Sequence, residues 1–201
     1  IRYTSPDRAA LRAQHARHGI LFALKSDAWS SCSVLPLPAP AELEMLVGWT
    51  GSPASTQKLV ESAVRATTTS HNPQRDETFL AESRACVDMF VDTLLSGDVG
   101  TPERNASYAV RKARALLQQL SGDRDLTIET PKLQELCVIA EQHGAAAKPS
   151  GAGGGDCGIA FATSTNEIAS ILREWTQRGI VPLNLQVHDP SHVEEGAADE
   201  R

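Results

Sequence analysis

Glycine is concentrated in one short segment whose composition is typical of a loop that binds an anion. Five of the 14 glycines lie between Gly151 and Gly158, within the sequence KPSGAGGGDCG that begins at Lys148. Because glycine reaches positive φ without a steric penalty, successive backbone N–H groups in such a run can turn toward one point and hold a phosphate group. Ser150 would add a hydroxyl donor and Lys148 a positive charge. The other reading of the run is a flexible turn or a close crossing of two backbones, which also requires glycine.

A second candidate segment, VGWTGSPAST at residues 47–56, is predicted to join a strand to a helix. The free N–H groups of Ala54, Ser55 and Thr56 then lie in the first turn of that helix, close to several hydroxyl groups. Such an arrangement suits an anionic ligand. The other reading is ordinary capping of the helix by the Ser52 side chain.

Neither segment contains a convincing general base. Asp27, Glu61 and Asp156 are candidates only by proximity, and a capping or solvated carboxylate is the simpler reading of each. The six histidines are scattered without the spacing of metal ligands, and we predict no metal site built by the protein. No two cysteines form a C-x-x-C pair, so buried reduced thiols are expected at Cys32, Cys86, Cys137 and Cys157.

The elements predicted around the glycine run exclude two common nucleotide-binding loops. A helix over residues 132–143 precedes the run, and a strand over residues 157–162 follows it. The Walker loop and the G-x-G-x-x-G fingerprint both lead directly into a helix, so the run belongs to neither type. Any phosphate binding here would depend on backbone N–H groups rather than on the dipole of a following helix.

Apolar residues recur at helical spacing in several stretches. They predict helices near residues 8–18, behind Pro53, and over 76–95, 103–120, 132–143 and 166–178, with Gly97, Gly122, Gly144 and Gly179 just beyond the last four. Four helix starts are expected at a hydroxyl residue followed by proline, namely Ser5-Pro6, Ser52-Pro53, Thr101-Pro102 and Thr130-Pro131. The basic cluster Arg111, Lys112 and Arg114 is expected to be a solvated face of its helix.

Strands are predicted over residues 33–37, 42–49, 157–162 and 180–187, with the proline-rich residues 36–40 as a turn between the first two. The long helical stretch comes in one block, which favours antiparallel pairing over a doubly wound sheet. The sequence therefore predicts an α+β fold with a small sheet of about four strands covered by helices. The last ten residues are polar and acidic and are expected to form a tail.

The composition limits the partners of the chain. Its 201 residues carry a formal net charge of −6, which argues against a general surface for nucleic acid or anionic membranes. No apolar run approaches the ~20 residues that span a bilayer, and the first residues are not a secretory signal. We therefore expect a soluble, cytoplasmic chain. Its first residue is Ile rather than Met, and we expect it to be part of a longer protein.

The two glycine-containing segments together resemble the phosphomevalonate kinase branch of the galactokinase, homoserine kinase, mevalonate kinase and phosphomevalonate kinase (GHMP) superfamily. KPSGAGGGDCGIA is similar to the third motif of the superfamily, and GWTGSPAST is more particular to the phosphomevalonate branch. The resemblance implies a C-terminal domain with a ferredoxin-like antiparallel sheet. It implies a junction segment at residues 1–30, the domain itself at residues 31–190 and the tail at residues 191–201.

The resemblance also implies a reaction, in which ATP, with Mg²⁺, transfers its γ-phosphoryl group to 5-phosphomevalonate and forms 5-diphosphomevalonate for isoprenoid synthesis. The phosphate-transfer loop would comprise Ser150, Gly151, Ala152, Gly153 and Gly154. Ser52, Ala54, Ser55 and Thr56 would border the phosphomevalonate pocket, and Lys148 and Asp156 would hold the loop in shape. Phosphoryl transfer asks mainly for positioning and for compensation of negative charge, which agrees with the residues themselves.

The main ATP phosphate loop of the superfamily, near its N-terminus, has no counterpart in these 201 residues. We therefore expect the chain to be a C-terminal portion whose partner is an N-terminal half carrying the catalytic residues, and we expect no kinase activity from it alone. Two alternatives stay open at this point. The chain could belong to a sister enzyme, such as mevalonate kinase or diphosphomevalonate decarboxylase, or it could be a non-catalytic interaction module that keeps the fold.

Overall fold

The computed structural model describes residues 1–38, 43–54, 61, 72–96, 105–151 and 153–185. Contacts divide the chain into two compact units, Ile1–Pro38 and Ala39–Arg201, called here the N-terminal and the C-terminal unit. Each unit is described by itself. The boundaries expected at residues 30 and 190 stay a prediction.

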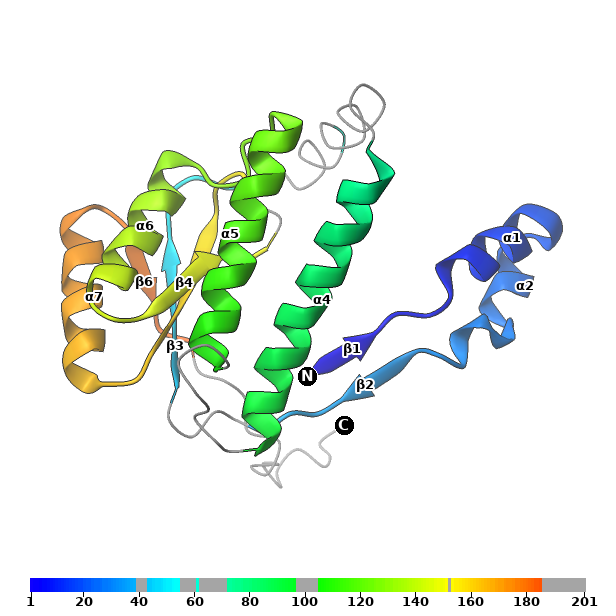
Figure 1. Ribbon diagram of the computed structural model, residues 1–201, viewed down its shortest axis with the longest axis horizontal. Coiled ribbons are helices and arrows are strands. Elements are labelled where there is room, and N and C mark those ends of the chain that lie inside the picture. The colour runs from blue at the N-terminus through cyan, green and yellow to red at the C-terminus, as the bar shows by residue number, and fades with distance from the viewer. Residues whose placement is uncertain (39–42, 55–60, 62–71, 97–104, 152, 186–201) are drawn as a thin grey trace, which may run out of the picture. The chain divides into compact units, whose positions relative to one another are not determined.

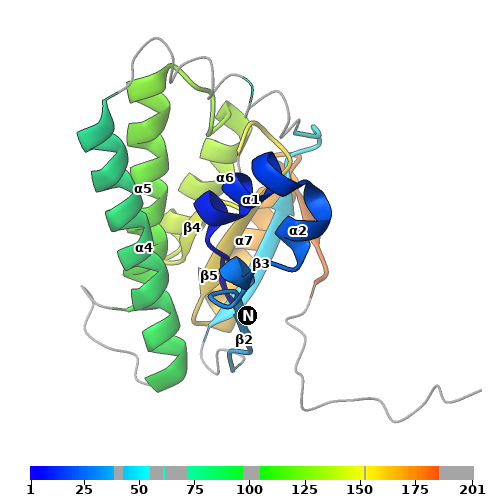
Figure 2. The same ribbon diagram turned by 90° about the vertical axis from the view of Figure 1, so that its right-hand side faces the viewer.

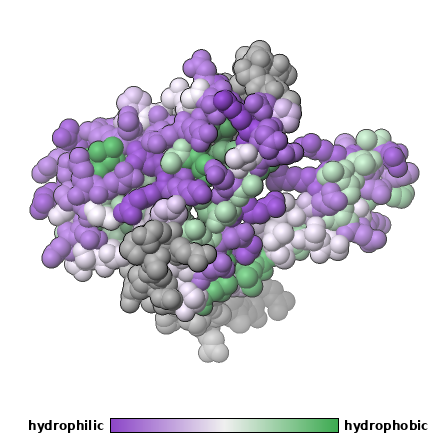
Figure 3. Space-filling view, in the orientation of Figure 1, coloured by the Kyte–Doolittle hydropathy of each residue, from purple (hydrophilic) through white to green (hydrophobic). Residues whose placement is uncertain are grey.

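The N-terminal unit is a two-stranded ribbon with short helices between its strands. Strand β1 (Arg2–Thr4) pairs antiparallel with β2 (Ser33–Leu35). Between them lie α1 (Arg8–His18), α2 (Ile20–Leu24) and the 3-10 turn η1 (Asp27–Trp29). Apolar side chains of α2 are largely exposed, and Figure 3 shows apolar surface over the helical part of this unit.

The expectation that residues 36–40 join two strands of one sheet is wrong. Strand β2 pairs with β1, whereas β3 (Glu44–Trp49) belongs to the sheet of the C-terminal unit. The short strand Arg2–Thr4 was not predicted, because three residues carry too little pattern to mark a strand.

The C-terminal unit contains a four-stranded sheet of β3, β4 (Ala146–Pro149), β5 (Cys157–Ala162) and β6 (Val181–Leu183). The strand order is β4-β5-β3-β6, and every neighbouring pair is antiparallel. A helical block separates β3 from β4, and one helix separates β5 from β6, which is the ferredoxin-like arrangement. The predicted α+β fold with a small antiparallel sheet is confirmed.

Helices cover both faces of this sheet (Figures 1 and 2). The pair α4 (Pro73–Ser96) and α5 (Ala106–Arg124) lies on one side, and the pair α6 (Pro131–Gln142) and α7 (Thr165–Gln177) lies on the other. In Figure 3 hydrophilic side chains cover much of α6 and α7.

Alternation along the strands divides the buried residues between the two faces. On β5, Ala160 and Ala162 face the core beneath α6 and α7, while Phe161 packs with Val110 of α5 and Phe90 of α4. The period of two places successive residues on opposite faces, so a strand buried on both sides is apolar throughout. The main core contains the fully buried Trp175, whose Nε1 donates to the Leu136 carbonyl at 3.0 Å.

The hydroxyl–proline signature marks only one of the described helix starts correctly. Thr130 caps α6 and Pro131 follows it, as predicted. In contrast, the N-cap of α1 is Asp7, whose side chain accepts from two backbone N–H groups, and the N-cap of α5 is Asn105. These residues are equally good caps and lie closer to the first helical turn. The start expected at Thr101-Pro102 lies outside the described residues. The helix predicted behind Ser52-Pro53 falls mainly on residues outside the described ranges.

Helix ends agree with the predictions at Gly144 and Gly179, which both have positive φ directly beyond the cap residues of α6 and α7. The end expected at Gly122 is wrong, since α5 continues to Arg124 and ends at Asp125 in the left-handed conformation. In the described part of the chain, no helix is long and apolar enough to span a membrane.

Candidate functional site

The glycine-rich run is the turn of a hairpin between β4 and β5. Pro149 pairs with Gly158, and the Ser150 N–H donates to the Cys157 carbonyl at 3.0 Å. The expectation that a helix directly precedes the run is therefore corrected, because β4 lies between α6 and the loop. The run still differs from the Walker loop and the G-x-G-x-x-G fingerprint, because it leads into a strand and not into a helix.

The backbone of this loop is left-handed at four consecutive positions. Gly153, Gly154, Gly155 and Asp156 all have positive φ, from 65° to 126°. Three glycines satisfy this geometry at no steric cost, while Asp156 is one of the few residue types that adopt it without glycine.

The loop is bound directly to the second candidate segment. The Asp156 N–H donates to the Ser52 carbonyl at 2.8 Å, and the Asp156 carbonyl accepts from both the N–H and the hydroxyl of Thr50, each at 2.8 Å. Gly155 also packs against Ser52, because a Cβ on Gly155 would be 3.2 Å from the Ser52 carbonyl oxygen. Two segments that are remote in sequence therefore form one structural unit.

A second contact holds the loop from the other side. The Gly154 N–H donates to the Ile128 carbonyl at 2.7 Å. A Cβ placed on Gly153 would lie 2.1 Å from that same carbonyl oxygen, which no side chain tolerates. Gly153 is therefore required for close approach of two backbones, which was one of the readings of the run.

The hydrogen bonds divide the loop's backbone N–H groups into two sets. Those of Ser150, Gly154 and Asp156 are already bound to protein carbonyls. In the described part of the chain, the N–H groups of Gly151, Gly153 and Gly155 have no such acceptor; Gly151 is exposed, whereas Gly153 and Gly155 are buried. Ser150 could then contribute its hydroxyl only. Ala152 lies outside the described residues.

The second segment is only partly described. Ser52 is exposed and Ala54 is half-buried, at the end of β3 beside the loop. Ser55 and Thr56 lie outside the described residues, so the expected cluster of free N–H groups at a helix start is untested.

The two residues expected to shape the loop differ in their surroundings. Lys148 is half-buried on β4, and its Nζ donates to the Pro149 carbonyl at 2.6 Å. Burial lowers the pKa of this amine. The Asp156 side chain is exposed, and its backbone rather than its carboxylate makes the contacts with the second segment.

The remaining carboxylate candidates are remote from the loop in sequence. Asp27 begins the 3-10 turn of the N-terminal unit, and Glu61 is exposed. The described residues contain no group of three or more His, Cys, Asp or Glu able to hold a metal ion.

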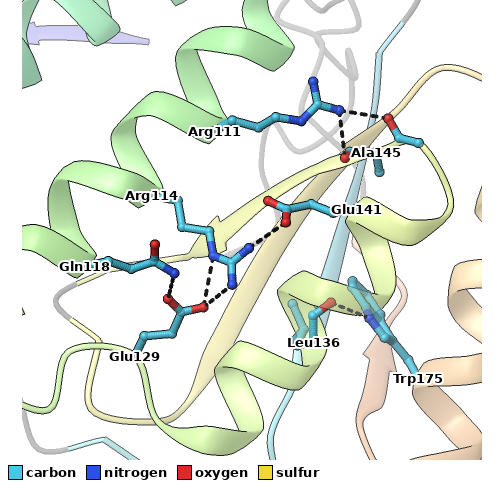
Figure 4. A network of polar contacts seen from close by, with 9 residues as sticks. Arg111, Arg114, Gln118, Glu129, Leu136, Glu141, Ala145 and Trp175 are labelled. Carbon is cyan, nitrogen blue, oxygen red and sulfur yellow. Dashed lines mark hydrogen bonds and ion pairs between the residues drawn. The ribbon is translucent and has the colours of Figure 1, made fainter.

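The prediction of a solvated basic face on α5 is wrong for Arg114. Its side chain is 8% exposed and forms ion pairs with Glu129 at 2.6 Å and Glu141 at 2.8 Å (Figure 4). Arg111 also has a structural partner, since it donates to the carbonyls of Gly144 and Ala145. Amphipathic spacing alone cannot show such partners, because they lie on other elements.

The cysteines fit the expectation of free thiols. Cys86 and Cys137 are buried, Cys32 and Cys157 are half-buried, and none forms a disulfide. Burial raises the pKa of Cys137 to about 12, so this thiol stays protonated at neutral pH.

Comparison with known sequences identifies the fold. Residues 104–181 match the family described as GHMP kinases C terminal. The chain contains a GHMP kinase C-terminal domain. A curated phosphomevalonate kinase from a Streptomyces species is 42% identical over 190 residues, which are 92% of this chain and 48% of that protein.

Solved structures agree with this GHMP kinase assignment. The Lin0012 protein of Listeria innocua superposes with a TM-score of 0.78 at 30% identity, over 90% of this chain and 49% of that one. Phosphomevalonate kinase of Streptococcus pneumoniae, in complex with phosphomevalonate and AMPPNP, superposes with a TM-score of 0.71 at 29% identity, over 89% and 49%. The chain thus spans about half the length of the relatives it matches.

The sequence alone did not identify three residues that hold the glycine-rich loop in place. Thr50 and Gly155 stood inside the two motifs, and their hydrogen-bonding or packing roles depend on how the motifs meet. Ile128 lies in an irregular segment before α6, and no local signal marks its carbonyl as an acceptor for the loop.

Proposed function

We propose that this chain is the C-terminal part of a phosphomevalonate kinase, which transfers the γ-phosphoryl group of ATP to 5-phosphomevalonate. The observation that carries the proposal is the direct bonding of the glycine-rich loop to the GWTGSPAST segment through Asp156, Ser52 and Thr50. The 42% identity to the Streptomyces phosphomevalonate kinase supports the choice of branch.

The proposed reaction needs little covalent chemistry from the protein. A phosphate oxygen of 5-phosphomevalonate attacks the γ-phosphorus of ATP, the bond between that phosphorus and the β,γ-bridging oxygen breaks, and ADP leaves with the bond's electron pair. The products are ADP and 5-diphosphomevalonate. Positioning of the two phosphates and compensation of their charge supply most of the catalysis in such transfers.

Within this proposal the loop Ser150, Gly151, Ala152, Gly153 and Gly154 lines the transfer region, and Ser52, Ala54, Ser55 and Thr56 border the phosphomevalonate pocket. The N–H groups of Gly151, Gly153 and Gly155 point to a role as donors to a phosphate oxygen, because the protein leaves them without acceptors in the described residues. Asp156 holds the loop in shape through its main chain, and Lys148 does so through the hydrogen bond of its Nζ to the Pro149 carbonyl. The catalytic residues lie in the N-terminal half of the enzyme, with which this chain would assemble.

A fusion enzyme tests the activity. Residues 1–201 replace the matching half of the Streptomyces phosphomevalonate kinase, and ADP release is measured with ATP and each of mevalonate, 5-phosphomevalonate and 5-diphosphomevalonate. We expect turnover with 5-phosphomevalonate, and none from the 201 residues alone. Preference for mevalonate, or release of CO₂ from 5-diphosphomevalonate, would place the chain in a sister branch.

A binding measurement on the 201-residue chain tests the proposal even if the fusion enzyme does not fold. Amide resonances of Gly151, Gly153 and Gly155 are followed by NMR during titration with 5-phosphomevalonate and with Mg·ATP, and inorganic sulfate serves as the control for nonspecific anion binding. We expect saturable shifts of these glycines with a phosphate-bearing ligand and weaker ones with sulfate. An inactive fusion together with a chain that binds neither ligand contradicts the proposal and favours a non-catalytic module.

A further inference from the structure

A buried ion pair lies directly behind one of the contacts that hold the glycine-rich loop. The side chains of Arg114 and Glu129 are each 8% exposed. Arg114 donates to one Glu129 carboxylate oxygen from Nε at 2.9 Å and from Nη2 at 2.6 Å, and Gln118 donates to the other oxygen at 2.7 Å. Both carboxylate oxygens are therefore engaged (Figure 4).

Glu129 shares a peptide group with the residue that binds the loop. The Ile128 carbonyl, which accepts from the Gly154 N–H at 2.7 Å, lies in the same plane as the Glu129 N–H. Because that plane is rigid, fixing Glu129 limits the direction in which the Ile128 carbonyl points. Residues 126–130 belong to no helix or strand, so no ladder of hydrogen bonds orients this peptide group instead.

The ion pair connects the peptide group between Ile128 and Glu129 to two helices. Arg114 stands on α5, and its Nη1 is paired with Glu141 of α6 at 2.8 Å. The guanidinium is thus held between the helices, and Glu129 is held by the guanidinium. A displacement of the Ile128 carbonyl would have to break this set of contacts.

Stability alone gives a weak reason for such a pair. Removing two charges from water costs several kcal/mol, and well-packed apolar residues often serve equally well. Burial opposes the charge of Arg114, but its hydrogen bonds to Glu129 and Glu141 outweigh that cost and raise its pKa. What an apolar pair would not supply is a fixed direction, because dispersion contacts do not orient a carbonyl group.

We propose that Arg114 and Glu129 are positioning residues of the glycine-rich loop, which hold the Ile128 carbonyl and, through it, Gly153 and Gly154 in the geometry for phosphoryl transfer. The catalytic consequence rests on the proposed function, whereas the anchoring of the Gly154 N–H does not. Neither residue touches the reacting groups in this scheme.

Hydrogen exchange of the Gly154 amide tests the anchoring in the 201-residue chain. Glu129→Gln removes the charge but keeps the size, and we expect exchange of the Gly154 N–H to become at least about tenfold faster while the amides of β5 change less than about twofold. The control is Glu135→Gln, which breaks the ion pairs of this α6 residue with Lys132 of the same helix and with Arg178 at the end of α7. Unchanged protection of Gly154 in Glu129→Gln overturns the proposal, whatever the activity.

Kinetics of the fusion enzyme test the consequence for catalysis. We expect Glu129→Gln to lower kcat at least about tenfold with little change in KM for 5-phosphomevalonate, because misplacement of about 1 Å can cost up to about 100-fold in rate. Glu135→Gln keeps the parent kcat. A Glu129→Gln enzyme with normal kcat contradicts the positioning role.

A double variant separates positioning from stability. Arg114→Met with Glu129→Leu replaces the pair by apolar groups, and we expect the thermal midpoint to recover while kcat and Gly154 protection stay low. Recovery of all three shows that the pair acts only through stability, and overturns the proposal. If the parent fusion is inactive with 5-phosphomevalonate and the 201-residue chain binds neither 5-phosphomevalonate nor Mg·ATP, the proposed function fails, and the exchange of Gly154 alone decides the anchoring.

Discussion

Two positions of the loop, Gly153 and Gly151, require glycine for different physical reasons. Gly153 combines a φ of 83° with a position where a Cβ would lie 2.1 Å from a backbone oxygen. Gly151 has neither restriction, since no atom lies within 4 Å of its Cβ position and its φ is not in the left-handed region. Contacts within the described protein therefore do not explain Gly151, whereas the proposed function would, through close approach of a phosphate to its main chain.

Alanine substitution should separate these two reasons. We expect Gly153→Ala to lower the free energy of unfolding by about 1–3 kcal/mol, because it adds both backbone strain and overlap. Gly151→Ala should stay within about 0.5 kcal/mol of the parent but weaken binding of 5-phosphomevalonate or ATP. Denaturant unfolding and calorimetric titration measure the two effects. A Gly153→Ala chain as stable as the parent would show that the contact with Ile128 is not tight.

Thr50 binds the two candidate segments together through its hydroxyl, which donates to the Asp156 carbonyl from a buried position. Thr50→Val keeps the branched shape and removes the donor, so we expect a loss of about 0.5–1.5 kcal/mol in stability. Thr50→Ser keeps the donor and should recover the larger part of that loss. Chemical denaturation of the three chains provides the comparison, and equal stability of the Val and Ser variants would exclude the hydrogen bond as the cause.

At the scale of secondary-structure elements, α6 packs onto the sheet where two glycines face each other. Gly48 of β3 is the register partner of Gly158 of β5. A Cβ on Gly48 would lie 2.8 Å from Leu136, and a Cβ on Gly158 would lie 2.5 Å from the same side chain. The missing side chains leave the room that Leu136 fills, which brings α6 close to the loop that follows β4.

Gly158→Ala should therefore destabilise the chain by about 1–3 kcal/mol through overpacking against Leu136. Leu136→Val in the same chain removes one methylene at the point of overlap, so we expect the double variant to be more stable than the sum of the single losses predicts. Thermal unfolding of the four chains gives a coupling energy, expected at about 0.5–3 kcal/mol. Simple additivity would show that the two residues do not meet as described.

The sequence predicted those elements that carry a strong local pattern. Helix α7 has a capping box at Ser164 and Glu167 and a clear apolar face, and β5 is an uninterrupted apolar run. Strand β4 was missed because its residues, AAKP, have no preference for extended structure; pairing with β5 is what makes them a strand.

The candidate site shows the same limit. Both segments could be found from glycine, serine and proline content, and the structure bonds them to each other through Asp156, while their role as a binding site stays a prediction. Which N–H groups are already bound, and that Arg114 is buried against Glu129, depends on contacts between distant parts of the chain. The spacing of apolar residues along one helix gives no information about such contacts. The sequence therefore predicted a solvated face for Arg114.

At the scale of the whole molecule, the two units differ sharply in their burial. Among the described residues, the N-terminal unit buries only Pro6 and Ala23, and every other buried apolar side chain belongs to the C-terminal unit. A segment of about 40 residues without a core rarely folds alone unless a disulfide or metal holds it. We therefore expect residues 39–201 to unfold cooperatively at nearly the midpoint of the full chain, and a peptide of residues 1–38 to lack stable structure.

Circular dichroism of the truncated chain and of the peptide checks this expectation. The full chain is the reference, and both fragments are measured at the same concentration. Loss of cooperative unfolding in residues 39–201 would contradict the assignment of the stabilising core to the C-terminal unit.

The four hydrogen bonds of Gly154 and Asp156 to Ile128, Ser52 and Thr50 have a thermodynamic consequence for ligand binding. A glycine-rich loop that was free before binding would lose roughly 1–2 kcal/mol of conformational entropy for each residue that becomes ordered. Here the order is established when the protein folds, because Ile128, Ser52 and Thr50 already hold the loop. Under the proposed function, an arriving phosphate would meet dipoles that need no reorientation, and the free energy of its contacts would be available for affinity and for the transition state.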